Sequence, residues 1–243
     1  MSKDIVKRIC LWSGPRNIST TLMYSFAQRK DTKVFDEPLY GYYLSHSLAK
    51  KYHPGAEDII STMENDGQKV VDMMMTENVK PVLFFKQMTH QLLDLDRSFI
   101  KKTMNIILTR DPKEMLPSFD KVIHNPTIHD VGYKLHIDLL DYFKMNNINY
   151  CVLDSKKVLL NPEVVLKKLC KNIGIPFKKN MLNWKKGSRP EDGIWAKYWY
   201  GNIHKSTGFI EYKRKAEQFP EHLKPLLQEC LPLYNRLLKQ AIG

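Results

Sequence analysis

The chain has 243 residues, of which 43% are hydrophobic and 11% aromatic, and it carries a net charge of +12 at pH 7. This composition supplies a full core and excludes an intrinsically disordered protein. The length indicates one α/β domain over residues 1–243, and the basic excess indicates a partner carrying phosphate or sulfate, although most of the lysines are scattered as on a solvated surface.

The four cysteines indicate a reducing compartment. They lie far apart, form no CxxC pair and sit mostly in apolar segments, which is typical of buried free thiols and not of disulfides or a zinc site. The N-terminus has no apolar signal region, and no window is long and apolar enough to span a bilayer. We therefore expect a cytoplasmic protein with no membrane contact and no bound metal.

Five short apolar segments are predicted to be strands. They alternate with longer segments of helical periodicity, which is the pattern of a parallel sheet covered on both faces. The predicted strands are residues 9–13, 33–36, 81–86, 105–109 and 149–154. The fold class is therefore α/β, with a parallel sheet of about five strands flanked by helices.

Three segments carry helical signals, and a fourth has no clean period. Residues 19–29 and 161–174 place apolar side chains on one face, and residues 221–239 form a closing amphipathic helix with a bend expected at Pro232. Residues 189–212 are rich in tryptophan and tyrosine. We interpret them as a lid that folds over the site, with an irregular packed surface as the alternative.

The first predicted strand leads into a loop with the length of a phosphate-binding loop. Ser19 replaces the second glycine of the GxxxxGK[ST] pattern, and Thr20 replaces its lysine. The helix that follows presents unpaired N–H groups and a partial positive charge to an anion. A helix capped by serine or threonine, without a ligand, is the alternative. The candidate anion-binding residues are Gly14, Arg16, Asn17, Ser19, Thr20 and Thr21.

A second anion-binding element follows the fourth predicted strand. Pro112 sets the first turn of a helix, which holds Arg110 at the carboxyl end of that strand, where open α/β sheets bind ligands. Ser118 lies about two helical turns further along and converges on the same anion. The alternative is Arg110 paired with Asp111 and a serine that faces solvent.

The segment from Arg110 to Ser118 resembles the 3′-phosphate-binding motif of sulfotransferases that use 3′-phosphoadenosine 5′-phosphosulfate (PAPS). Residues 14–21 resemble the 5′-phosphosulfate loop of the family, and residues 154–177 resemble the strand and helix that follow. The resemblance implies a P-loop NTPase-like fold and an enzyme that moves a sulfuryl group from PAPS to a hydroxyl or amine of a small-molecule acceptor. The nucleotide product is adenosine 3′,5′-bisphosphate (PAP), and no metal is implied.

The sequence departs from the family pattern at Arg16, whose position relative to Thr20 is shifted by one. It resembles a divergent bacterial-type branch, whose members are called sulfotransferase-like, or aminotransferase-like after fused neighbours. No lysine of this sequence lies in the sequence context of a lysine that forms a Schiff base, so the aminotransferase-like name has no support here. The late nucleotide-binding loop of the family implies that Lys205, Ser206 and Thr207 close over the 3′-phosphate.

Glu37 and His90 are the candidates for the base that takes the acceptor's proton. We expect Glu37, because Pro38 keeps it extended and because we expect its strand to lie beside the first strand, near Arg16. His90 would then orient the acceptor or contact the bridging oxygen together with Lys86. The predicted catalytic residues are Glu37, His90, Arg16 and Lys86, and the predicted acceptor pocket comprises Tyr40, Tyr42, Tyr43, His46 and residues 195–199.

Structural roles remain open for both candidate bases, since Glu37 could pair with Arg16 or Lys33 and His90 could cap a helix.

The absent loop lysine disfavours a P-loop small-molecule kinase that uses ATP and magnesium. A non-catalytic nucleotide-binding protein is the other alternative. No basic helix or nucleic-acid fold is present, so we expect no nucleic-acid partner. The acceptor and the oligomeric state, including a homodimer, stay open.

Overall fold

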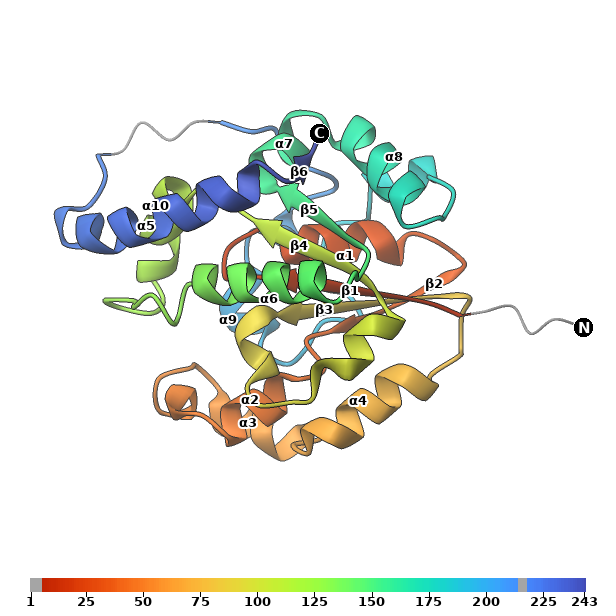
Figure 1. The fold of residues 1–243 in the computed structure, drawn as a ribbon, viewed down its shortest axis with the longest axis horizontal. Helices are drawn as coiled ribbons and strands as arrows, with labels where there is room; N and C mark the ends of the chain where they lie inside the picture. Colours follow the sequence, from red (N-terminus) through yellow and green to blue (C-terminus); the bar gives the residue numbers. More distant parts are fainter. Residues whose placement is uncertain (1–5, 214–217) are drawn as a thin grey trace, which may run out of the picture.

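The computed structural model describes residues 6–213 and 218–243. In this part of the chain a six-stranded, all-parallel sheet runs in the order β2-β3-β1-β4-β5-β6 (Figure 1). The α/β fold with a helix-flanked parallel sheet is thus confirmed. The strands are β1 (Lys7–Ser13), β2 (Thr32–Asp36), β3 (Val82–Met88), β4 (Met104–Thr109), β5 (Tyr150–Asp154) and β6 (Ala241–Ile242).

Helices cover both faces of the sheet, as Figure 1 shows. Apolar side chains of α1, α7 and α8 pack on one face, and those of α4, α5, α6 and α10 pack on the other. The strands between them are buried on both sides, which explains their nearly continuous apolar sequences. These helices are α1 (Ser19–Ala27), α4 (Gly67–Thr76), α5 (Pro112–Asp120), α6 (Tyr133–Met145), α7 (Ser155–Leu160), α8 (Pro162–Asn172) and α10 (Lys224–Leu238).

Three further short helices lie at the carboxyl end of β2. They are α2 (Tyr40–Ser45), α3 (Ala56–Thr62) and α9 (Ala196–Trp199). Their apolar side chains form a separate small core, in which Tyr40 and Tyr43 pack with Trp195 and Tyr200. This small core brings part of the segment 189–212 against the edge of the sheet where ligands bind in α/β folds.

The position of β2 differs from our expectation. We placed β2 beside β1, but β3 lies between them, because β2 pairs with β3 and β3 pairs with β1. The long β2–β3 connection contains α2, α3 and α4 and returns the chain next to β1, so order along the sequence does not set order in the sheet. As a result, Asp36 is in register with Lys86 of β3.

Two smaller features lie in the C-terminal part of the chain. The strand β6 has only two residues, too few for a periodic pattern, and it pairs with Val152 and Leu153 of β5. The helix α10 runs through Pro232 without interruption, after a 3₁₀ turn at Glu221–Leu223. None of the helices in the described ranges is long and apolar enough to cross a membrane.

Candidate active site

A cavity of about 460 Å³ lies at the carboxyl end of the sheet. Its walls come from the loop between β1 and α1, from residues that follow β2, β3 and β4, and from residues 195–213. Both anion-binding elements identified in the sequence reach this cavity. The predicted site residues that line it are Arg16, Asn17, Ser19, Thr20, Thr21, Glu37, Lys86, His90, Arg110, Ser118 and Ser206.

The loop after β1 is held in a strained backbone conformation. Arg16 and Ile18 have φ values of 58° and 62°, in the left-handed region that side chains other than glycine rarely adopt. Asn17 is buried between them; its Nδ2 donates to the carbonyl of Leu108 at 3.1 Å, and its own carbonyl accepts from Ser155 Oγ at 2.9 Å. The loop is therefore fastened to β4 and α7 by hydrogen bonds.

The start of α1 has no side-chain cap. Ile18 occupies the N-cap position and offers no hydrogen bond, so the serine- or threonine-capped helix that we considered is wrong. The first N–H groups of a helix have no partner within the helix, and their dipoles favour an anion. The N-terminus of α1, with Thr20 and Thr21, therefore presents an anion-binding surface to the cavity.

Two arginines meet beside this loop without a carboxylate between them. Arg16 Nε donates to Ser118 Oγ at 3.1 Å, and Arg110 Nη1 donates to the Arg16 carbonyl at 2.8 Å. Burial and the nearby charge of Arg110 lower the pKa of Arg16. Arg110 does not pair with Asp111, which caps α5 through Lys113 N. Arg110 Nη2 contacts Glu114 at 3.4 Å, whereas Arg110 Nε is buried with no hydrogen-bond partner.

A buried charge cluster forms where β2 and β3 pair, and its residues Glu37, Lys86 and Tyr200 line the cavity. Lys86 Nζ donates to Asp36 Oδ1 at 2.8 Å, to the hydroxyl of Tyr200 at 2.8 Å and to Glu37 Oε1. Tyr200 in turn donates to Asp36 Oδ2 at 2.7 Å. The three N–H donors of the lysine are thus all occupied. Burial lowers the pKa of Lys86, but Asp36 and Glu37 raise it, and the balance lies well above the usual value.

Glu37 is held by Lys86 and not by Arg16 or Lys33, as the position of β3 explains. Its Oε2 accepts from Gln91 Nε2 at 2.6 Å, and the residue is 5% exposed. Burial raises the pKa of Glu37, Lys86 opposes that shift, and Asp36 adds to it. The expectation that Pro38 keeps Glu37 extended is wrong, because its φ is 45°. A residue before proline avoids the right-handed helical region, and here it takes the left-handed one.

Two histidines complete the wall next to Glu37. His90 lies in the 3₁₀ turn after β3, packs on Tyr43 with ring centroids 4.6 Å apart and has an unpartnered, buried Nδ1. His53 forms a hydrogen bond with the Tyr40 hydroxyl at 2.8 Å. Burial lowers the pKa of His90 to about 3 and that of His53 to about 4. Both imidazoles are therefore neutral at physiological pH.

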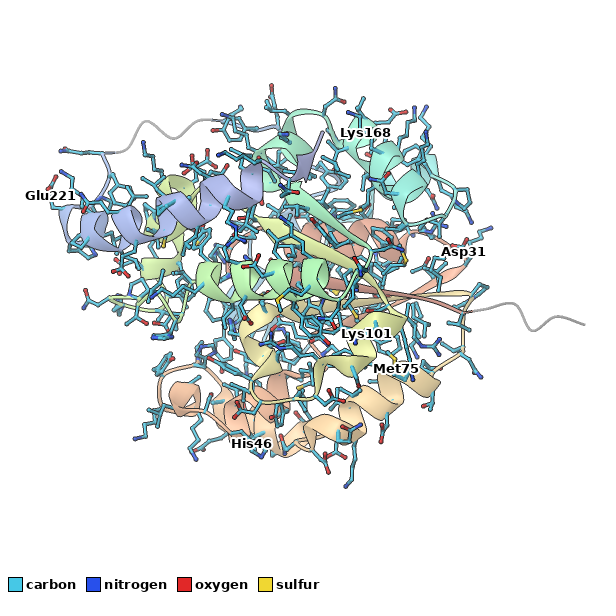
Figure 2. The ribbon with its side chains drawn as sticks, viewed as in Figure 1. Asp31, His46, Met75, Lys101, Lys168 and Glu221 are labelled. Carbon is cyan, nitrogen blue, oxygen red and sulfur yellow. The ribbon has the colours of Figure 1, made fainter. Side chains whose placement is uncertain are left out.

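Some predicted residues lie outside the cavity. Lys205 and Thr207 line an adjacent hollow together with Ser206. Gly14 does not line the cavity, and a Cβ there would meet the Val131 carbonyl at 2.9 Å. Tyr40, Tyr43, Trp195 and Trp199 line the cavity as expected for the acceptor pocket. Tyr42 and His46 do not; they pack on each other, and His46 is exposed near α2 (Figure 2).

Sequence reasoning missed several residues of the cavity. His53, Asp130 and Lys213 line it, although none belongs to a recognisable motif; Asn202 and Tyr212, which also line it, lie within the predicted lid segment 189–212. They come from connections whose residues show no regular hydrophobic period, so only the folded chain brings them to the site. Within the ranges that the structure describes, no three histidine, cysteine, aspartate or glutamate side chains gather as a metal site would require.

Comparison with known proteins identifies the family. A sequence model of the sulfotransferase domain matches residues 7–241. The chain belongs to the sulfotransferase family. Two solved members have the same fold. The sulfotransferase domain of the curacin biosynthetic pathway has a TM-score of 0.55 and 14% identity, over 93% of this chain and 97% of that one. The Alicyclobacillus acidocaldarius sulfotransferase has a TM-score of 0.52 and 9% identity, over 96% and 94%.

Two curated relatives of this sulfotransferase-family chain come from Arabidopsis thaliana. Branched-chain-amino-acid aminotransferase-like proteins 2 and 1 are 40% and 39% identical to it over 228 residues, which is 93% of this chain. The chain spans 40% of the length of these relatives. Their names refer to the longer proteins, so no aminotransferase activity is carried over to this chain.

Proposed function

We propose that the protein transfers the sulfuryl group of PAPS to a hydroxyl or amine of an acceptor. The observation that carries this proposal is the buried, unpartnered Nε of Arg110 beside the Arg16–Ser118 contact. A buried donor without an acceptor is costly, and an anionic oxygen at this point would satisfy it. The 3′-phosphate of PAPS supplies such oxygens, and the N-terminus of α1 suits the 5′-phosphosulfate.

In the proposed reaction the acceptor oxygen or nitrogen forms a bond to sulfur as the bond from sulfur to the bridging phosphate oxygen breaks. Negative charge then grows on the leaving 5′-phosphate of PAP, next to the α1 N-terminus, where fixed dipoles stabilise it. The proton of the acceptor passes to Glu37, whose raised pKa suits a general base. Because its three donors are occupied, we assign Lys86 to holding Glu37 in position.

The proposal predicts that PAP binds far more tightly than adenosine 5′-phosphate. Hydrogen bonds to charged groups contribute about 1.5–3 kcal/mol each, so Arg110→Ala should weaken PAP binding at least about tenfold. The same substitution should leave the affinity for adenosine 5′-phosphate nearly unchanged, since that nucleotide lacks the 3′-phosphate. Calorimetric titration of both nucleotides measures these values, and equal affinities in the unsubstituted protein would rule out PAPS as the donor.

We also predict that turnover needs no divalent metal. The phosphate loop has Thr20 where nucleotide triphosphatases have a lysine that acts together with magnesium. Activity assayed with PAPS should be the same with a chelator as with added magnesium. Activity with ATP that disappears with the chelator and returns with magnesium would instead support the kinase alternative.

The cytoplasm is the compartment that we propose. Cys10, Cys151, Cys170 and Cys230 are all free and buried, as thiols of proteins in reducing compartments commonly are. Burial raises the pKa of Cys10 to about 12, which keeps that thiol protonated and unreactive.

A further inference from the structure

The charged residues that line the cavity come from several segments of the chain. Its permanent cations other than Lys86 are Arg16, Arg110 and Lys213. Arg16 and Arg110 are joined through the phosphate loop, and Lys213 follows Tyr212, which donates to Glu114 of α5. These groups therefore surround the proposed nucleotide site, where Glu211 also lines the cavity. The other two carboxylates of the lining, Glu37 and Asp130, come from the segments after β2 and α5.

The buried cluster on the acceptor side carries more negative than positive charge. Asp36 and Glu37 share Lys86 as the only cation in contact with them among the described residues. Lys86 is 1% exposed, so water screens this cluster poorly. A buried carboxylate whose negative charge is not balanced destabilises the fold unless it takes up a proton or pairs with another cation. The cavity beside Glu37 is the open route by which a cation can reach it.

Asp130 adds a second negative charge to the same wall. Its Oδ1 accepts from the Tyr52 hydroxyl at 3.0 Å, and its charge acts on Tyr43, His53 and His90. Neither histidine offsets it, because both imidazoles are neutral at physiological pH. The carboxylates Glu37 and Asp130 thus line this part of the cavity. Among the described residues, the permanent cations that reach it are the already paired Lys86 and Arg16, whose Nη1 donates to the Trp199 carbonyl at 3.4 Å.

The remaining surface of this wall is aromatic. Tyr40 packs edge-on against Trp195 with ring centroids 5.1 Å apart, and His53 lies between Tyr40 and Trp199, at 5.9 and 6.4 Å. The faces of such rings attract cations electrostatically, most strongly where water is excluded. Aromatic rings together with carboxylates form the type of pocket that recognises organic ammonium groups.

We infer that the acceptor is a cationic amino alcohol, whose ammonium group lies among Tyr40, Tyr43 and Trp199 near Asp130 while its hydroxyl meets Glu37. This inference rests on the proposed sulfuryl transfer and specifies its substrate class. The hydroxyl oxygen forms the bond to sulfur, the bridging bond of PAPS breaks, and the hydroxyl proton passes to Glu37. The ammonium group takes no part in the bond changes and serves recognition.

The test compares three alcohols of matched size in calorimetric titrations of the full chain saturated with PAP. They are choline, its uncharged carbon isostere 3,3-dimethylbutan-1-ol, and anionic 3-hydroxypropionate. We expect choline to bind at least about tenfold more tightly than the isostere and the anion to bind weakest. Equal or tighter binding of the isostere or the anion, or no binding of choline, overturns the inference.

Two variants test whether Asp130 causes the preference for choline over the isostere. Asp130→Asn keeps the hydrogen bond from Tyr52 but removes the charge, and it should reduce the preference for choline over the isostere by about threefold or more. Asp58→Asn removes an exposed carboxylate that pairs with Lys197 and should leave the preference unchanged. An unchanged preference in Asp130→Asn contradicts the inference. Because PAP saturation is measured first, failure of PAP to bind is a failure of the proposed function and is distinguishable.

Discussion

Glu37→Gln should lower turnover with PAPS by about 10²-fold or more while the affinity for PAP stays nearly unchanged. Glutamine keeps the shape of the side chain and its contact with Lys86 but cannot take the acceptor's proton, and its amide nitrogen cannot accept the hydrogen bond from Gln91 Nε2. Glu37 contacts Lys86 and Gln91 and not Arg16 or Arg110, so we expect the proposed nucleotide contacts to be retained. The balance of charge also improves, because Asp36 and Lys86 then form a neutral pair. This gain opposes the loss of the Gln91 hydrogen bond, so we expect only a small change in thermal stability.

The pH dependence of turnover distinguishes Glu37 from His90. A base must be deprotonated to act, so kcat/KM should rise with pH through the raised pKa of Glu37, and this acidic limb should disappear in Glu37→Gln. His90, with a pKa of about 3, is already deprotonated over the usual assay range and is a weak base. His90→Asn is the matched control. If it abolishes turnover and Glu37→Gln does not, His90 is the base.

Lys86→Met should destabilise the protein by about 3–5 kcal/mol, because it leaves Asp36 and Glu37 side by side without a cation. For a chain of this size such a loss lowers Tm by roughly 10 °C. Methionine fills much of the space of the lysine stem, so the effect reports on charge more than on packing. Differential scanning calorimetry measures the change, and Lys102→Met, which replaces an exposed lysine, is the control.

The loss of folding stability caused by Lys86→Met should increase as the pH rises. Burial raises the pKa of Glu37 above its unfolded value, and loss of Lys86 raises it further. A raised carboxyl pKa stabilises the folded state below the unfolded pKa, and this stabilisation is lost as the pH rises through the folded pKa. The loss of stability should therefore grow as the pH rises from the unfolded pKa of the carboxyl through its raised pKa in the folded variant. If the loss of stability shrinks as the pH rises, or if Lys86→Met causes no loss, charge pairing does not stabilise the cluster.

Local patterns in the sequence located most of the sheet and the part of the cavity where we propose that the nucleotide binds. The predicted strands agree with β1 to β5 to within a few residues, because strands buried on both faces are continuous apolar segments. The loop before α1 and the segment from Arg110 to Ser118 reach one cavity because both follow central, adjacent strands, β1 and β4. Residues that follow two neighbouring parallel strands lie close together because the strands end at the same edge of the sheet, and this does not depend on how the intervening segments fold.

The acceptor side depended on contacts that no local pattern encodes. Sequence order suggested that β2 adjoins β1, and this error placed Glu37 near Arg16 instead of Lys86. For the same reason the contact of Tyr200 with Asp36 could not be predicted, since the two residues are 164 positions apart in the chain.

The sequence by itself determined the fold class and the family and predicted the anion-binding elements, since strand periodicity, helix termini and turn residues act over a few neighbouring positions. The tertiary structure alone decided the strand order, the pairing of Lys86 and the charge of the acceptor wall. Burial gives these interactions their strength, and burial arises only when segments distant in the sequence pack together.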